Sequence, residues 1–210
     1  SGQVWVVYNG EIYNFQELRE RLADRGYRFR SSGDTEVLVG LWLVAGPEMV
    51  QHLRGMYAFV IWDNRTRTLF AARDPFGIKP LYYSDNGGTL RIASQVRALV
   101  AGGQVDARPD AAGHVGFFLW GHVPDPWTFY EGVRALEAGT ALLCSPGAGP
   151  KVRCFFKMSE FIARCREPRR TVSREELRSV LVDSVRRHLV ADVPVGVFLS
   201  AGIDSGAVAA

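Results

Sequence analysis

This chain of 210 residues has little that favours metal or disulfide chemistry. Its three cysteines, Cys144, Cys154 and Cys165, lie far apart and form no CxxC pair. The four histidines are also scattered, and none lies three to five residues from another. Zinc sites and disulfide frameworks both need closer spacing of their ligands or thiols. We therefore expect neither a protein-ligated transition metal nor a disulfide framework.

Long apolar runs and a strong net charge are lacking as well. No run approaches the roughly 18 apolar residues of a membrane span, and no secretory leader opens the chain. The formal net charge is +3, with 47% hydrophobic and 22% charged residues. A charge this small does not indicate binding to nucleic acid or to an anionic membrane. We expect a globular, cytoplasmic protein without nucleic-acid or membrane partners, and a homodimer of the full-length protein is left open.

The first part of the chain predicts strands and helices in separate blocks. Val4–Tyr8 has the apolar and aromatic profile of a buried strand. Asn14 is expected to cap a first helix through a variant capping box with Glu17, and a second helix is expected from Asp34. Three strands of an antiparallel meander, separated by turn residues, are predicted at 56–63, 68–73 and 80–83. This order predicts an α+β fold rather than a regular βαβ fold.

A second domain is expected near the end of the chain. Residues 161–172 are rich in arginine and poor in apolar anchors, which is typical of a solvated linker. A nucleic-acid patch would need interleaved aromatic residues and a basic domain behind it. Ser173 then opens a capping box with Glu176, and Val195–Leu199 reads as a buried strand. We predict a first domain at 1–160, a linker at 161–172 and the start of a second domain at 173–210.

A loop of small residues follows the strand predicted at Val195–Leu199. The sequence SAGIDS, residues 200–205, offers two hydroxyls, accessible backbone N–H groups and one carboxylate. Small side chains at a helix N-terminus favour a bound phosphate, and Asp204 can hold the Mg²⁺ that neutralises it. The loop is not a Walker motif, which needs a lysine after its last glycine. Close packing of a strand against a helix is the alternative interpretation.

A second informative stretch is YNGEIYN, residues 8–14. Asn9 offers a side-chain amide and Gly10 an unobstructed backbone N–H, and an oxyanion hole needs two such donors. Glu11 adds a polar anchor beside them. The alternative is a tight Asn-Gly turn. Asp34 also has an alternative role, because aspartate is a common helix N-cap.

Six stretches occur in a familiar order: VYNGEIYNFQELRERL, SSGDTEVLVGLW, RGMYAFVIWD, AARDPFGIKPLYY, VPDPWTFYEGVRALEAGT and HLVADVPVGVFLSAGIDSGAVAA. Over almost its whole length the chain resembles the glutamine-hydrolysing asparagine synthetase family. The resemblance implies an N-terminal-nucleophile glutaminase domain, which is a sandwich of antiparallel sheets flanked by helices. The start of a parallel α/β synthetase domain of the pyrophosphatase type follows it. It also implies that glutamine is hydrolysed to ammonia, and that ATP and Mg²⁺ activate aspartate as β-aspartyl-AMP for amidation.

The resemblance also implies roles for individual residues. Asn9 and Gly10 match the oxyanion hole, and with Glu11 they match the set that contacts glutamine. Asp34 matches the aspartate that receives the α-ammonium of glutamine. The ATP-binding segment is Phe198, Leu199, Ser200, Ala201, Gly202, Ile203, Asp204 and Ser205, with Asp204 directed to Mg²⁺. The stretch RDPFGIKPLYY looks architectural, with a turn at Asp74-Pro75 and Gly77.

The chain departs from the family pattern at the missing nucleophile and at Ala201, and more mildly at Gly206, where a hydroxyl residue is common. Glutaminase domains of the family begin with a catalytic cysteine, and none of the three cysteines lies at that position. We therefore expect an internal fragment that alone neither hydrolyses glutamine nor forms asparagine. Ala201 stands where the family usually has glycine, which is harmless only if its φ is negative.

Two other functions stay open beside an asparagine synthetase. One is an amidotransferase of the same architecture that acts on another adenylated acceptor. The other is a noncatalytic scaffold domain that keeps the fold without the nucleophile.

Overall fold

The computed structural model describes residues 2–165, 171–191 and 193–210, which form two compact units, Ser1–Phe161 and Ile162–Ala210. The strands are β1 (Val4–Ile12), β2 (Gly55–Asp63), β3 (Thr68–Arg73), β4 (Tyr82–Asp85), β5 (Leu90–Ala93), β6 (Arg134–Ala135), β7 (Thr140–Cys144) and β8 (Lys151–Cys154). The helices of the first unit are α1 (Phe15–Asp24), α2 (Thr35–Ala45), the 3₁₀ helix η1 (Gly46–His52), α3 (Val96–Ala101) and α4 (Ala111–Trp120). Helix α5 (Met158–Cys165) crosses the boundary, and the second unit holds α6 (Arg174–His188) and α7 (Ile203–Ala209).

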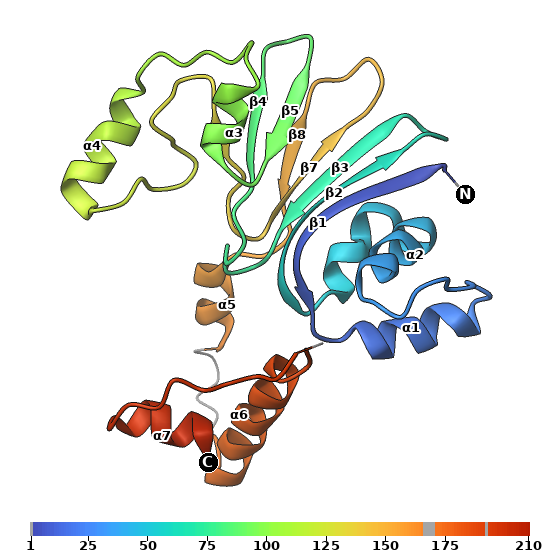
Figure 1. The fold of residues 1–210 in the computed structure, drawn as a ribbon, viewed down its shortest axis with the longest axis vertical. Coiled ribbons are helices and arrows are strands. Elements are labelled where there is room, and N and C mark those ends of the chain that lie inside the picture. Colours follow the sequence, from blue (N-terminus) through green and yellow to red (C-terminus); the bar gives the residue numbers. More distant parts are fainter. Residues whose placement is uncertain (1, 166–170, 192) are drawn as a thin grey trace. The chain divides into compact units, whose positions relative to one another are not determined.

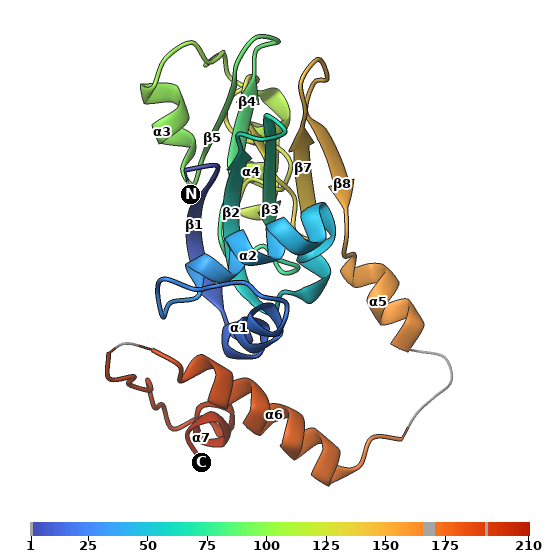
Figure 2. The same ribbon diagram turned by 90° about the vertical axis from the view of Figure 1, so that its right-hand side faces the viewer.

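The first unit is built on two antiparallel sheets. One has five strands in the order β1-β2-β3-β7-β8, and the other has three in the order β5-β4-β6. Helices α1 and α2 cover one face of the five-stranded sheet (Figures 1 and 2). The other face packs against the three-stranded sheet through a second apolar cluster. The α+β class predicted from the sequence is confirmed.

The two cores follow from the alternation of side chains along β2. Tyr57, Phe59 and Ile61 point to the helical side and are fully buried, because successive strand residues face opposite sides of a sheet. The intervening Ala58 belongs to the cluster between the sheets. The helices contribute Leu18, Leu22, Val37, Leu38 and Leu41 to the first core. Each fully buried large side chain stabilises the fold by about 1.5–3 kcal/mol.

The prediction that Val4–Tyr8 is a buried strand is wrong for one of its faces. Strand β1 alternates between exposed and partly buried residues, and Trp5 and Val7 are 60% and 75% exposed. The reason is the position of β1 at the edge of the five-stranded sheet. The cluster between the sheets draws on β2, β3 and β7 but not on β1.

The predicted meander is correct for its first two strands and wrong for the third. β2 and β3 pair as an antiparallel hairpin, but β4 lies in the other sheet, and β7 takes the place beside β3. Asp74 directs the chain away, because its buried carboxylate accepts hydrogen bonds from the N–H groups of Phe76, Ile78 and Lys79. Gly77 N–H donates to the Asp74 carbonyl at 3.0 Å, which confirms the predicted turn.

Asn14 does not form the predicted capping box. It stands at the N-cap of α1, but its side chain makes no capping hydrogen bond. Its Nδ2 donates to the His52 carbonyl, and its Oδ1 accepts from Arg54 N, both at 2.9 Å. The amide therefore links the end of β1 to the segment that leads into β2.

We expect Asn14→Ala to lower the free energy of unfolding of the first unit by about 2 kcal/mol, because it removes both hydrogen bonds at a buried position. All five tryptophans, Trp5, Trp42, Trp62, Trp120 and Trp127, lie in that unit, so urea unfolding followed by tryptophan fluorescence reports on it alone. Gln16→Ala on the exposed side of α1 is the control, with a change below about 0.5 kcal/mol. Equal stabilities for the two variants would contradict this role of Asn14.

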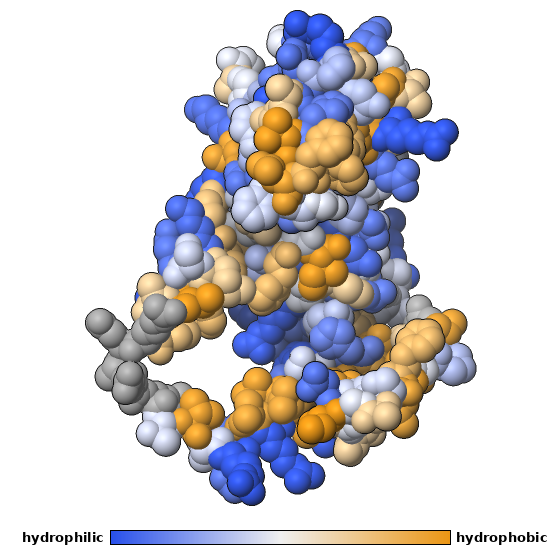
Figure 3. Space-filling view, turned by 90° about the vertical axis from the view of Figure 1, so that its left-hand side faces the viewer, coloured by the Kyte–Doolittle hydropathy of each residue, from blue (hydrophilic) through white to orange (hydrophobic). Residues whose placement is uncertain are grey.

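Helix α4 turns its glycines inward and its large apolar residues outward. A Cβ on Gly113 would come within 1.9 Å of the Thr128 carbonyl, and one on Gly116 within 2.4 Å of Pro124 Cδ. The large apolar residues that the helix exposes are Val115, Phe117, Phe118, Leu119 and Trp120. Figure 3 shows apolar side chains gathered on this part of the surface. Among the described helices, none is long and apolar enough to cross a membrane.

The second unit agrees with the sequence prediction at its helices but not at its strand. Ser173 Oγ accepts from Glu176 N at 3.1 Å and the Glu176 carboxylate accepts from Ser173 N, so the capping box is confirmed. Val195–Leu199 forms no strand. A strand needs a partner strand for its backbone hydrogen bonds, and among the described residues beyond Cys154 no strand is found. Part of the expected linker lies in α5, and its residues 166–170 fall outside the described structure.

Candidate functional site

The Asp34 side chain faces β1 rather than the helix that it precedes. It stands at the N-cap of α2, but its backbone is helical (φ −77°, ψ −27°) and its side chain makes no capping hydrogen bond. Its Oδ2 instead accepts a hydrogen bond from the Tyr8 hydroxyl at 2.7 Å and another from Ile12 N at 3.0 Å. The interpretation of Asp34 as a side-chain cap is therefore wrong.

The two donors to Asp34 lie on either side of the predicted Asn9-Gly10-Glu11 triplet. All of these residues belong to β1, where Asn9 pairs with Ala58 and Gly10 with Tyr57. The alternative of a tight Asn-Gly turn is therefore wrong. Sequence separation hides this proximity, because Tyr8 and Asp34 are 26 positions apart in the chain.

The backbone of β1 presents the Gly10 N–H on the same edge as the Ile12 N–H. In an antiparallel ladder, the N–H groups of alternate residues point toward the paired strand. Tyr13 N donates to the Arg54 carbonyl on the β2 side, whereas Ile12 N donates to Asp34. Gly10 lies two residues before Ile12 on the strand, so its N–H points to the same side, which is the unpaired edge of β1. One edge thus carries a backbone donor and a carboxylate.

The position of Gly10 requires glycine for two reasons: its backbone conformation and the close approach of strand β2. Its φ is +151°, which side-chain-bearing residues rarely adopt, and a Cβ would lie 2.1 Å from the Met56 carbonyl oxygen. Gly55 opposite makes a similar approach, since its Cβ would lie 2.0 Å from the Glu11 carbonyl oxygen. At this end of the β1–β2 ladder, neither glycine can therefore be replaced by a residue with a side chain unless the backbone shifts.

The electrostatics of this edge keep the Tyr8 hydroxyl a donor. Burial raises the pKa of Tyr8 well above its usual value, and the hydrogen bond and charge of Asp34 raise it further. Glu11 adds a smaller contribution of the same sign. The sequence analysis missed Tyr8. The usable signal was that Tyr8 and Ile12 lie four residues apart on one strand, so their side chains share a face.

The loop predicted to bind phosphate is ordered by its own hydroxyls. Ser200 Oγ lies 2.8 Å from Ser205 Oγ and accepts from Gly202 N at 3.2 Å. Ser205 Oγ also donates to the carbonyls of Ser200 and Gly202, each at 3.1 Å. A helix follows, as the sequence predicts, but this helix, α7, already begins at Ile203 within the predicted loop and places Asp204 in its first turn.

The residues of this loop fit a phosphate ligand in their chemistry. A Cβ on Gly202 would come within 3.2 Å of Ser200 Oγ, so the glycine keeps the space beside the hydroxyls open. Phe198, Leu199, Ala201 and Ile203 are exposed. No cluster of three potential ligands for a metal occurs in the described part of the chain.

If this loop holds ATP in the full-length protein, as the resemblance implies, we expect Ala201→Gly to change the affinity for ATP and the release of pyrophosphate by less than about twofold. The described residues with positive φ, glycines aside, are Arg67 and Gln104, so Ala201 carries no left-handed strain for glycine to relieve. ATP titration and pyrophosphate release measure the two steps. A clear gain in either would show that the alanine is strained when nucleotide binds.

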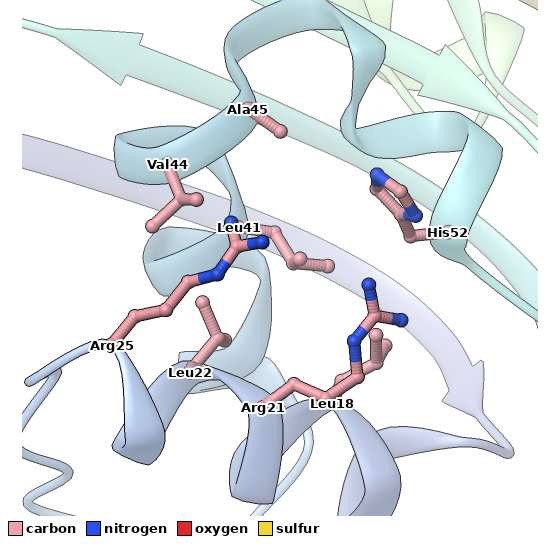
Figure 4. A pocket seen from close by; sticks show the side chains of 8 residues that line it. All are labelled: Leu18, Arg21, Leu22, Arg25, Leu41, Val44, Ala45 and His52. Atoms are coloured by element: carbon pink, nitrogen blue, oxygen red, sulfur yellow. The ribbon is translucent and has the colours of Figure 1, made fainter.

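A separate small pocket lies between α1, α2 and η1 (Figure 4). Its volume is about 60 Å³, and it contains none of the predicted site residues. Apolar residues form its floor, and Arg21, Arg25 and His52 surround it. It is too small for a substrate of the size of glutamine.

Comparison with protein families matches residues 1–153 to a glutamine amidotransferase domain and residues 176–210 to asparagine synthase. The chain belongs to the glutamine amidotransferase domain family, and the beginning of an asparagine synthase region follows that domain. It is 38% identical to "Asparagine synthetase [glutamine-hydrolyzing] 1" of Bacillus subtilis, over 96% of this chain and 31% of that protein. The resemblance predicted from the sequence is confirmed.

Two further proteins extend the comparison. "Amidase chry2" of Gibberella zeae is 34% identical over 100% of this chain and 31% of its own length. The structure of glutamine phosphoribosylpyrophosphate amidotransferase from B. subtilis aligns with a TM-score of 0.51 and 26% identity, over 74% of this chain and 29% of that one. This confirms the predicted amidotransferase fold. The chain spans less than a third of the length of the two curated relatives.

Proposed function

We propose that the full-length protein is a glutamine-hydrolysing asparagine synthetase, with its glutamine site at the unpaired edge of β1. The observation that carries this proposal is the placement of the Asp34 carboxylate. It is hydrogen-bonded to Tyr8 and Ile12, the residues on either side of Asn9-Gly10-Glu11. A carboxylate beside a backbone donor suits a substrate that has an ammonium at one end and a carbonyl at the other.

Each residue then has a role in the reaction. Asp34 accepts hydrogen bonds from the α-ammonium of glutamine, and Glu11 supports binding of the same substrate. The Gly10 N–H and the Asn9 amide stabilise the oxyanion that forms when the side-chain carbonyl is attacked, a contribution of about 2.7–4 kcal/mol for a single donor. Cys144 and Cys154 lie on β7 and β8, which β2 and β3 separate from β1 in the sheet. We therefore propose neither of them as the nucleophile.

The second unit would bind ATP at the loop from Phe198 to Ser205. The hydroxyls of Ser200 and Ser205 and the N-terminal turn of α7 would hold the pyrophosphate, and Asp204 would hold its Mg²⁺. Bound ATP supplies the adenylating chemistry that activates aspartate. We further propose a cytoplasmic location for the protein.

Pyrophosphate release by the full-length protein tests this function. With ATP, Mg²⁺ and glutamine present, we expect aspartate to stimulate release at least about tenfold over other amino acids. The relative named an amidase supports a second candidate, an amidotransferase with a different acceptor. Stimulation by another carboxylic acid, with no response to aspartate, would favour that candidate. No pyrophosphate release with any acceptor would favour a noncatalytic scaffold.

A further inference from the structure

The Asp34 carboxylate uses its two oxygens unequally. Oδ2 accepts both the Tyr8 hydroxyl and the Ile12 N–H. Among the described residues, no hydrogen bond to Oδ1 is found. One oxygen is therefore held by the protein, and the other is left for a ligand.

The ring and the hydroxyl of Tyr8 have separate contacts, so its packing does not depend on its hydrogen bond to Asp34. Its ring packs against the first apolar core, whose members include Ile12 and Phe59. Its hydroxyl reaches from there to Asp34 at 2.7 Å, a length typical of an O–H donor to a charged oxygen. The backbone donor of Ile12 is fixed by β1, so the two donors together restrict the rotation of the carboxylate more than either donor would alone.

We propose that Tyr8 is a positioning residue for glutamine: its hydroxyl and the Ile12 N–H hold Asp34 Oδ2 so that Oδ1 faces the substrate ammonium. This inference rests on the proposed function, because it requires that Asp34 receives the ammonium. Tyr8 itself does not contact the reacting atoms. It acts on the affinity for glutamine through the orientation of Asp34, because a pre-oriented acceptor avoids the cost of ordering on binding.

A purely structural role for Tyr8 makes a different prediction. In that case the Tyr8–Asp34 bond would only fasten β1 to the start of α2. Its loss would then lower stability and reduce glutamine-dependent and ammonia-dependent synthesis by the same factor. A positioning role acts on one substrate alone.

The test is Tyr8→Phe in the full-length protein, which removes the hydroxyl and keeps the ring. We expect the KM for glutamine to rise about tenfold, equivalent to about 1.4 kcal/mol, with kcat changed less than about twofold. Synthesis from added ammonia should be unchanged. Tyr57→Phe is the matched control, because Tyr57 lies buried in the same core and its hydroxyl has no hydrogen-bond partner in the described residues. It should leave both activities as they are.

Asp34→Asn separates this inference from the proposed function. A raised KM in Asp34→Asn with an unchanged KM in Tyr8→Phe would overturn the positioning role and leave the proposed function standing. An unchanged KM in both variants would remove the proposed role of Asp34 itself. Equal losses with glutamine and ammonia in Tyr8→Phe would assign the bond a structural role, which also overturns the inference.

Discussion

Glutamine hydrolysis by the full-length protein is expected to fall at least about 100-fold when Gly10 is replaced by alanine. The loss of one oxyanion donor alone costs about 10²–10³ in rate. The new Cβ would lie 2.1 Å from the Met56 carbonyl oxygen, and it would sit on a backbone with φ +151°. The strand must move to relieve both, and the N–H moves with it. Release of glutamate from glutamine measures the effect.

Gly26→Ala is the matched control for Gly10→Ala. Gly26 also has a positive φ, +85°, but nothing lies within 4 Å of the position of its Cβ. This substitution should cost about 1 kcal/mol of stability and leave glutamine hydrolysis intact. Ammonia-dependent synthesis should persist in Gly10→Ala, which would show that the protein still folds. Hydrolysis by Gly10→Ala within threefold of the parent would contradict an oxyanion hole at this residue.

For Asp34→Asn, we expect a rise of about ten- to more than a hundredfold in the KM for glutamine, with little change in stability. Asparagine can accept the hydrogen bonds of Tyr8 and Ile12 through its side-chain oxygen, so the local structure is kept. Its amide nitrogen then replaces Oδ1 and turns a donor toward the ammonium. A charge-assisted hydrogen bond of about 1.5–3 kcal/mol is lost. Steady-state kinetics with varied glutamine give the KM.

Asp24→Asn provides the control for the loss of a carboxylate. Asp24 is exposed at the last residue of α1, and its substitution should leave the KM unchanged. Synthesis from ammonia should be the same in the parent and in both variants, because ammonia does not use the glutamine site. If Asp34→Asn lowers synthesis from ammonia as much as from glutamine, the residue has a general structural role instead.

The sequence predicted those parts of the fold that depend on neighbouring residues. The strand at 68–73 and the capping box at Ser173 are correct, because alternation and capping are local patterns. The third strand of the meander was assigned to the wrong sheet, because β7 lies about 70 residues beyond β3 and competes for the same edge. The strand expected at Val195–Leu199 needs a partner that the described residues do not supply.

The candidate site was predictable in its residue types but not in its contacts. The spacing of Asn9, Gly10 and Glu11 indicated donors and an anchor, and Asp34 was open to two interpretations. Only the tertiary structure shows that Asp34 turns from α2 toward β1. Tyr8 looked like a core residue because its ring does pack against the core. Its hydroxyl bonds to Asp34, which is far away in the sequence, so this contact could not be predicted.

Transfer of the amide nitrogen tests the central claim most directly. The full-length protein is incubated with ATP, Mg²⁺, aspartate and glutamine labelled with ¹⁵N in its amide, and the products are analysed by mass spectrometry. The account predicts ¹⁵N-labelled asparagine together with AMP and pyrophosphate. Labelled ammonia without labelled asparagine, and without ATP consumption that depends on aspartate, would contradict it.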